Sequence, residues 1–177
     1  CIANTKERLK ITKIVFEDPN FKKCLLKNAA QNNWQYADEV IRIRCTSDKS
    51  NEKIKSVNGI ENFPELLRLF LNGNRIKNIN LSKNLKLEKL YLPGNLIHSI
   101  DLSNNINLTH LDLSGTTIQD FDFSNNVNLY ELIIQFSNIK HIDLSKNINL
   151  TILDLEHNKL KSINVSQNKS LKSLSLQ

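Results

Sequence analysis

The sequence predicts an α/β fold: a solenoid with a curved parallel sheet on one face and a helical cap at its amino-terminal end. The main observation is a 21-residue pattern that runs from residue 66 to residue 176. Its copies open at Leu66, Leu87, Leu108, Leu129, Leu150 and Leu171. Each copy begins L-x-x-L-x-L, with Ile134 in place of the last leucine in one copy, and these alternating apolar residues indicate a short strand with one buried face. A segment with a helix-start signal precedes the copies. A fixed period of this length indicates units that stack on their neighbours.

Three parts are expected along the chain. Residues 1–13 are polar and should form a flexible amino-terminal tether. Residues 14–39 should form the helical cap. Residues 40–177 should form the repeats, as one degenerate unit, five regular units and one partial unit. Because each repeat contacts mainly its neighbours, we expect one quasi-linear domain.

The cap contains a clear helix start. Asp18 is a natural N-cap, and Pro19 suits the first helical turn, where its missing N–H costs nothing. Apolar residues then recur at helical spacing at Phe21, Cys24, Leu25 and Leu26. We therefore predict a helix over residues 19–29 whose apolar face covers the open end of the first repeat.

The first repeat is degenerate but retains the pattern. Its residues at the leucine and asparagine positions of the regular copies are Val40, Ile43, Cys45 and Asp48. It is five residues longer than a regular unit, and most of the extra length lies in the polar segment 47–52. We expect that segment to be a loop.

Position nine of each regular copy favours asparagine, as at Asn74, Asn95 and Asn158. Its amide can satisfy backbone groups at the buried turn after the strand. Thr116 and Ser137 replace it in two copies, where we expect a weaker ladder. Aspartate and serine also recur every 21 residues, at Asp101, Asp122, Asp143, Ser103, Ser124 and Ser145. Residues that recur in register are expected to form turns rather than a catalytic site.

The full pattern, clearest at residues 87–105, is that of a leucine-rich repeat. The segment D-P-N-F-K-K-C-L-L-K-N (18–28) and the segment G-I-E-N-F-P (59–64) resemble the cap and first repeat of bacterial extracytoplasmic leucine-rich-repeat proteins, of the Bacteroidetes and internalin-like type. The resemblance implies a leucine-rich-repeat solenoid with a curved parallel β-sheet on the concave face, a helical N-terminal cap and a non-enzymatic binding role. Many such proteins have an EF-hand-like loop after the cap. Residues 31–39 lack its spacing and turn glycine, so calcium is not expected.

The amino end suggests a location. The chain begins at Cys1 and contains no methionine, so it resembles a bacterial lipoprotein after signal-peptide cleavage, with a lipid on that thiol. The alternative is that Cys1 is an arbitrary starting point. The resemblance implies a lipid-anchored protein of the bacterial cell envelope, either periplasmic or surface-exposed. Cys24 and Cys45 should lie on faces that pack together, and a disulfide and two buried free thiols both remain open.

Signals for other chemistry are weak. The four histidines, His98, His110, His141 and His157, have no metal-ligand spacing. The sequence contains no nucleophile elbow and no phosphate-binding glycine loop. We therefore expect no enzyme activity, no metal and no cofactor.

The candidate site is the concave side of the sheet, here called the strand face, formed by repeat positions three, five, seven and eight. Position three gives Arg42, Arg68, Lys89, His110, Glu131 and Ile152. Position five gives Arg44, Phe70, Tyr91, Asp112, Ile133 and Asp154. Positions seven and eight add Asn72, Pro93, Ser114, Gln135, Phe136, Glu156 and His157. The amino-terminal half is basic and aromatic, and the carboxy-terminal half is acidic with aliphatic residues.

These columns favour a protein partner on the strand face, because arginine and aromatic side chains are the usual interface anchors. Two forms are open: a periplasmic immunity or inhibitor protein that neutralises a toxin or secreted effector, and a surface adhesin. Nucleic-acid or anionic-polymer binding is the alternative of another class. The sequence argues against it, because acidic residues on the same face would repel phosphate.

The carboxy-terminal half repeat has no polar cap in this sequence. We expect its leucines to be partly exposed and to allow self-association.

Overall fold

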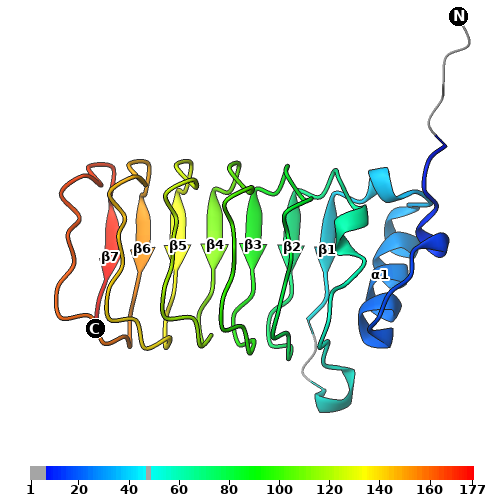
Figure 1. Ribbon diagram of the computed structural model, residues 1–177, viewed down its shortest axis with the longest axis horizontal. Helices are drawn as coiled ribbons and strands as arrows, with labels where there is room; N and C mark the ends of the chain where they lie inside the picture. The colour runs from blue at the N-terminus through cyan, green and yellow to red at the C-terminus, as the bar shows by residue number, and fades with distance from the viewer. Residues whose placement is uncertain (1–6, 47–48) are drawn as a thin grey trace, which may run out of the picture.

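The computed structural model of the protein describes residues 7–46 and 49–177. Within these residues a seven-stranded parallel sheet follows chain order from β1 to β7, and a single α-helix packs beside β1 (Figure 1). The three-residue strands are β1 (Arg42–Arg44), β2 (Arg68–Phe70), β3 (Lys89–Tyr91), β4 (His110–Asp112), β5 (Glu131–Ile133), β6 (Ile152–Asp154) and β7 (Ser173–Ser175). Short 3-10 turns lie at Ile11–Lys13, Ala37–Glu39, Ser50–Glu52 and Ile60–Asn62. The leucine-rich-repeat solenoid predicted from the sequence is therefore confirmed.

Equivalent residues of successive repeats face each other across the sheet. Leu69 pairs with Leu90, and Leu90 pairs with Leu111. These central leucines are fully buried, as are the leucines at repeat positions one and six of the units before the last partial one. The 21-residue period thus places every inward side chain above its counterpart and builds one continuous core.

The cap helix α1 spans Pro19–Asn32, three residues beyond the predicted end. Asp18 caps it, because its Oδ1 accepts the backbone N–H groups of Asn20 and Phe21 at 2.8 and 3.1 Å. Its Oδ2 accepts those of Lys55 and Ser56 at 2.7 and 3.2 Å. Burial acts to raise the pKa of Asp18, but these four donors lower it overall. One carboxylate thus starts the helix and ties it to the first repeat.

The apolar face of α1 closes the end of the solenoid, as predicted. Phe21 and Leu25 are fully buried. Cys24 of α1 and Cys45, directly after β1, form a disulfide with their Cα atoms 5.8 Å apart. Of the two alternatives left open by the sequence, the structure therefore contains the disulfide.

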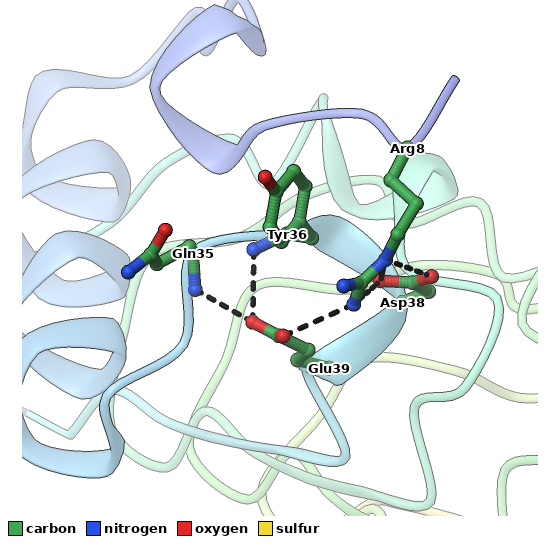
Figure 2. Close-up of polar contacts among 5 residues, drawn as sticks. All are labelled: Arg8, Gln35, Tyr36, Asp38 and Glu39. Atoms are coloured by element: carbon green, nitrogen blue, oxygen red, sulfur yellow. Dashed lines mark hydrogen bonds and ion pairs between the residues drawn. The ribbon is translucent and has the colours of Figure 1, made fainter.

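The expected tether is wrong for its described part, because the chain is already structured from Arg8 onward. The Arg8 guanidinium bonds to Asp38 and Glu39 and lies 4.1 Å from the centre of the Tyr36 ring (Figure 2). Lys10 forms an antiparallel bridge with Tyr36, and Ile11 is buried. A polar composition indicated flexibility, but one arginine with two carboxylates and an aromatic ring holds this segment against the cap.

The hydrogen bonds drawn in Figure 2 also lower the pKa values of two carboxyl groups. Hydrogen bonds from Arg8 lower the pKa of Asp38. The backbone N–H groups of Tyr36 and Gln35 lower the pKa of Glu39, and Arg8 adds to the effect. Both carboxylates are therefore held ionised. Cys1 and Asp48, for which the sequence suggested roles, lie outside the described residues.

Position-nine side chains satisfy the turn after each strand. The amide of Asn95 donates to the carbonyl oxygens of Leu71 and Leu92 at 2.9 and 3.0 Å, and its Oδ1 accepts the N–H of Ile76. Thr116 retains one such bond, to Leu113 at 2.8 Å. Ser137 donates to the carbonyl oxygens of Leu113 and Gln135 at 3.4 and 3.0 Å. That the ladder is weaker at these hydroxyl positions stays a prediction.

The recurring aspartates are turn residues. Oδ1 of Asp101, Asp122 and Asp143 accepts the N–H of Ser103, Ser124 and Ser145 respectively, in each case at 2.9 Å. Hydrogen bonds from the serines lower the pKa of all three aspartates. Their recurrence follows from turn chemistry.

A second asparagine ladder, not anticipated from the sequence, stabilises the turns that precede strands β3 to β7. Its members are buried and lie at Asn84, Asn105, Asn126, Asn147 and Asn168. Asn126, for example, donates to the carbonyl oxygens of Leu102 and Asn105, both at 3.0 Å. These side chains bridge consecutive repeats where the backbone has no strand partner.

No helix in the described ranges is long and apolar enough to cross a membrane. At the far end, Leu174 and Leu176 are 42% and 44% exposed, as the sequence suggested. Whether they mediate self-association remains a prediction.

Candidate functional site

The structure aligns the predicted columns of the strand face. Position three runs in register from Arg42 through Arg68, Lys89, His110 and Glu131 to Ile152. Position five runs from Arg44 through Phe70, Tyr91, Asp112 and Ile133 to Asp154. The basic and aromatic residues are therefore neighbours in space. Along the sheet from β1 to β6, the side chains of the face change from basic to acidic.

An aromatic stack dominates the amino-terminal half. The rings of Phe70 and Tyr91 lie 5.0 Å apart and within 7° of parallel. The Arg44 guanidinium lies 5.5 Å from the centre of the Phe70 ring. Both rings are half-buried, because each covers part of the next. Parallel strands bring the residues together, and stacking then restricts their rotamers.

Tyr91 links this stack to the acidic half. Its hydroxyl donates to Glu131, two strands away, at 3.4 Å. Burial raises the pKa of Tyr91 to about 12, and the negative charge of Glu131 contributes. The phenol is therefore neutral at physiological pH and available as a hydrogen-bond donor.

His110 occupies the centre of the face. Its Nδ1 lies 2.8 Å from Oγ1 of Thr109, and its ring lies 5.7 Å from that of Tyr130. Burial lowers the pKa of His110, and the charge of Lys89 lowers it further. The centre of the face is therefore a neutral, partly aromatic surface.

Hydrogen bonds hold the acidic half in place. Gln135 donates from Nε2 to Asp154 at 2.7 Å, and its backbone N–H donates to Oγ of Ser114 at 3.0 Å. Asp112 accepts the N–H of Ser114 at 2.9 Å. The aliphatic side chains of Ile133 and Ile152 are half-buried between these polar groups. Asp112 and Asp154 are therefore acceptors of fixed orientation in this half.

Positions seven and eight lie in the turns that follow the strands. They form the carboxy-terminal edge of the strand face, with Asn72, Pro93, Ser114, Gln135 and Glu156 in one row. In the row beside it, Phe136 and His157 stack with ring centroids 4.3 Å apart and an interplanar angle of 17°. Phe136 is 59% exposed and is thus the most accessible aromatic residue of the predicted set.

The other two histidines lie away from this face. His98 and His141 are exposed on the back of the solenoid, where His98 contacts Oγ1 of Thr117. The four histidines are therefore spread over different surfaces.

One exposed apolar feature was missed. Leu85, Ile106, Val127 and Ile148 recur at the turn before four successive strands and are between 42% and 54% exposed. We call them the aliphatic ridge. A groove of about 580 Å³ lies beside it, lined in part by Tyr130, Asn107 and Asn128. The signal was present, because an aliphatic residue follows the buried asparagine in all four copies.

The arrangement as a whole suits recognition. It offers a rigid arginine and aromatic surface, a neutral centre and an acidic end. The charged groups are spread along the sheet rather than converging on one point, as they would around a reacting atom.

Comparisons with known proteins agree with this geometry. Residues 16–147 match the model of a family described as the leucine-rich-repeat domain of endo-beta-N-acetylglucosaminidase EndoS. Among curated protein sequences, none matches the chain.

Solved structures of Listeria monocytogenes internalins are similar. Internalin InlF is 25% identical with a TM-score of 0.82, and the alignment covers 98% of this chain and 54% of that chain. The functional domain of InlJ is 20% identical with a TM-score of 0.55, with 97% and 48% covered. Internalin C2 is 18% identical with a TM-score of 0.55, with 97% and 98% covered. This chain thus spans about half the length of the InlF structure, and the InlJ and C2 likenesses concern the fold alone.

Proposed function

Because the chain belongs to the leucine-rich-repeat family described from EndoS, we propose that it is a binding module whose strand face holds a partner protein. The internalin-like fold suggests protein binding or adhesion in general. The position of the partner on the strand face is our inference from the side chains found there.

The observation that carries the proposal is the stack of Arg44, Phe70 and Tyr91. The few residues that carry most of the binding energy in protein interfaces are enriched in tryptophan, tyrosine and arginine. Here the two rings are held parallel, 5.0 Å apart, before any partner arrives. Fewer rotamers are then lost on binding, which favours affinity.

The charge gradient supplies orientation. Arg42, Arg44 and Arg68 lie at one end of the face, and Asp154 and Glu156 lie toward the other. A partner with the opposite gradient would be attracted in one direction and repelled in the reverse one. The same carboxylates would repel a polyanion, so we favour a protein over a nucleic acid.

We further propose that the protein acts outside the cytoplasm. The disulfide between Cys24 and Cys45 is typical of an oxidising compartment. The similar internalins support a surface or secreted bacterial protein, so we favour adhesion over the periplasmic immunity role. A lipid on Cys1 would anchor it, and mass spectrometry of the native protein tests that modification.

We infer no enzymatic role. The family name refers to an enzyme, but the match is to its leucine-rich-repeat domain. The arrangement of charged groups along the strand face is suited to contact with a broad surface.

A capture experiment with two matched variants tests the proposal. The first replaces Phe70, Tyr91 and Phe136 on the strand face with serine. The second replaces Leu85, Ile106 and Ile148 of the aliphatic ridge with serine. Each tagged protein is incubated with the surface and secreted fractions of the native organism.

We expect the strand-face variant to lose the protein captured by the unchanged chain, while the ridge variant retains it. Circular dichroism must show that both variants are folded. The reverse pattern of capture would refute the proposal.

A further inference from the structure

The edge of the strand face contains an unusual backbone feature at repeat position eight. Glycine occupies this position in three successive repeats, as Gly73, Gly94 and Gly115, with φ between 65° and 68°. The next two repeats have Phe136 and His157 there, with φ of 53° and 55°. A side chain with a Cβ atom is disfavoured in this left-handed conformation, and bulky residues are rare in it.

Fold requirements do not account for the aromatic pair. Glycine meets the backbone requirement of this turn in the three preceding repeats, so it would also do so at positions 136 and 157. Phe136 contributes little to the core, because it is 59% exposed. A strained and exposed ring that the fold does not need indicates a functional contact.

The two faces of the Phe136 ring have different surroundings. One face stacks on His157, 4.3 Å away between centroids. On the other side the neighbouring repeat has Gly115, which provides no side chain. A Cβ atom added to Gly115 would meet only the backbone of Gly94, at 3.6 and 3.7 Å. Gly115 therefore places no side chain over this side of Phe136, and we call the space above the Gly115 backbone and beside the ring the slot.

The strand-face positions of the three repeats that flank the slot are acidic. Residues 110–115, 131–136 and 152–157 contain four carboxylates and no lysine or arginine. Asp112 and Asp154 are oriented by the N–H groups of Ser114 and Glu156, at 2.9 and 3.1 Å. A flat cation fits this combination, because a guanidinium stacks on an aromatic face and donates to carboxylates in its own plane.

We propose that this slot binds an arginine side chain of the partner protein, with the guanidinium stacked on Phe136 above Gly115. This inference rests on the proposed function and names the chemistry of the partner at one edge of the strand face. The slot would be occupied by a protruding arginine while the Phe70 and Tyr91 stack contacts the body of the partner.

The test uses the whole chain and short peptides as probes. The ¹⁵N-labelled protein is titrated with acetyl-Gly-Arg-Gly-amide, and then with the same peptide carrying citrulline, a neutral group of nearly equal shape. Peptides carrying lysine and tryptophan follow. Amide shifts are monitored over the entire solenoid.

We expect the arginine peptide to shift the amides of Gly115, Phe136 and His157, and the citrulline peptide to leave them in place. The lysine and tryptophan peptides should bind more weakly than the arginine peptide. The F136G variant should weaken arginine binding by about threefold to fivefold or abolish it, as expected for a partly exposed cation–π contact. It should stay folded, since it restores the residue of the preceding repeats.

Equal shifts from the citrulline peptide, stronger binding of tryptophan, shifts at another surface, or unchanged binding to F136G would each overturn the inference. The peptide measurement needs no native partner, so it is independent of the capture experiment. Loss of capture by the strand-face variant without arginine binding would refute the slot alone. If the arginine peptide binds but the strand-face variant still captures the protein, the strand-face proposal alone is refuted.

Discussion

Phe70 and Tyr91 lie on adjacent strands with their rings stacked 5.0 Å apart and 7° from parallel. Neither residue is near the other in sequence, and the 21-residue period alone brings them together. The pair is both a stabilising contact and the central part of the proposed binding surface, and these two roles can be measured separately.

The first prediction concerns the energy of this stack. Replacing Phe70 and Tyr91 by leucine, singly and together, should give a coupling energy of about 0.5–1.5 kcal/mol, the usual value for an aromatic pair. Urea unfolding of the four proteins measures it. Strictly additive effects would show that the rings do not interact in solution.

The second prediction concerns alkaline pH. The pKa of Tyr91 is raised to about 12, first by burial and then by Glu131. An unfolded tyrosine ionises near pH 10. The neutral phenol therefore stabilises the fold fully below about pH 10, and this contribution disappears as pH rises toward about 12. Ultraviolet titration should show a late phenolate component that is absent in Y91F and shifted to lower pH in E131Q. An unchanged late component in Y91F would contradict the assignment.

The third prediction concerns acid. The pKa values of Asp101, Asp122 and Asp143 are lowered by their serine partners. Their ionised forms therefore stabilise the fold above the unfolded pKa of about 3.9, and this stabilisation is lost as pH falls through the lowered values.

Asparagine should replace these aspartates well, because Asn80 and Asn164 already accept the same turn N–H, each at 3.0 Å. Variants with one, two or all three of D101N, D122N and D143N should keep the melting temperature of the unchanged chain at pH 7. At pH 3 their melting temperature should fall less than that of the unchanged chain, and each added substitution should reduce the fall further. If the melting temperature falls by the same amount in all variants at pH 3, these aspartates do not contribute to acid destabilisation.

The fourth prediction compares two asparagines in the same repeat. Asn126 is buried and bridges two carbonyl oxygens, each of which also accepts a backbone N–H. Asn128 is exposed and donates to the carbonyl oxygen of Ile106 at 3.1 Å. N126A should cost roughly 2 kcal/mol of unfolding free energy, and N128A about 0.5 kcal/mol or less. Chemical denaturation measures the unfolding free energy of each variant. Equal losses would show that burial does not determine how much these asparagines stabilise the fold.

The sequence predicted the structural features that the 21-residue repeat determines. A fixed period specified the strands, their register, the inward leucines and the Asp/Ser turns, because every copy repeats the same local physics. It also placed the two columns of the strand face. The N-cap at Asp18 was visible because its chemistry is local.

The sequence did not show features that depend on contacts between distant or unlike residues. Arg8 holds the amino-terminal segment through Asp38 and Glu39, about thirty positions away, and a polar composition conceals such a contact. The left-handed turn at Phe136 was hidden because an aromatic residue replaces glycine without changing the spacing. The aliphatic ridge could not be predicted although its pattern is regular, because an exposed aliphatic residue in a turn has no fixed structural role in a repeat.

The central claim is that the partner lies on the strand face, and site-specific photocrosslinking tests it most directly. A benzophenone amino acid is placed at position 91 on the strand face or at position 106 on the aliphatic ridge, and each protein is irradiated with the captured partner. We predict a covalent complex from position 91 and none from position 106. A complex from position 106 alone would contradict the claim.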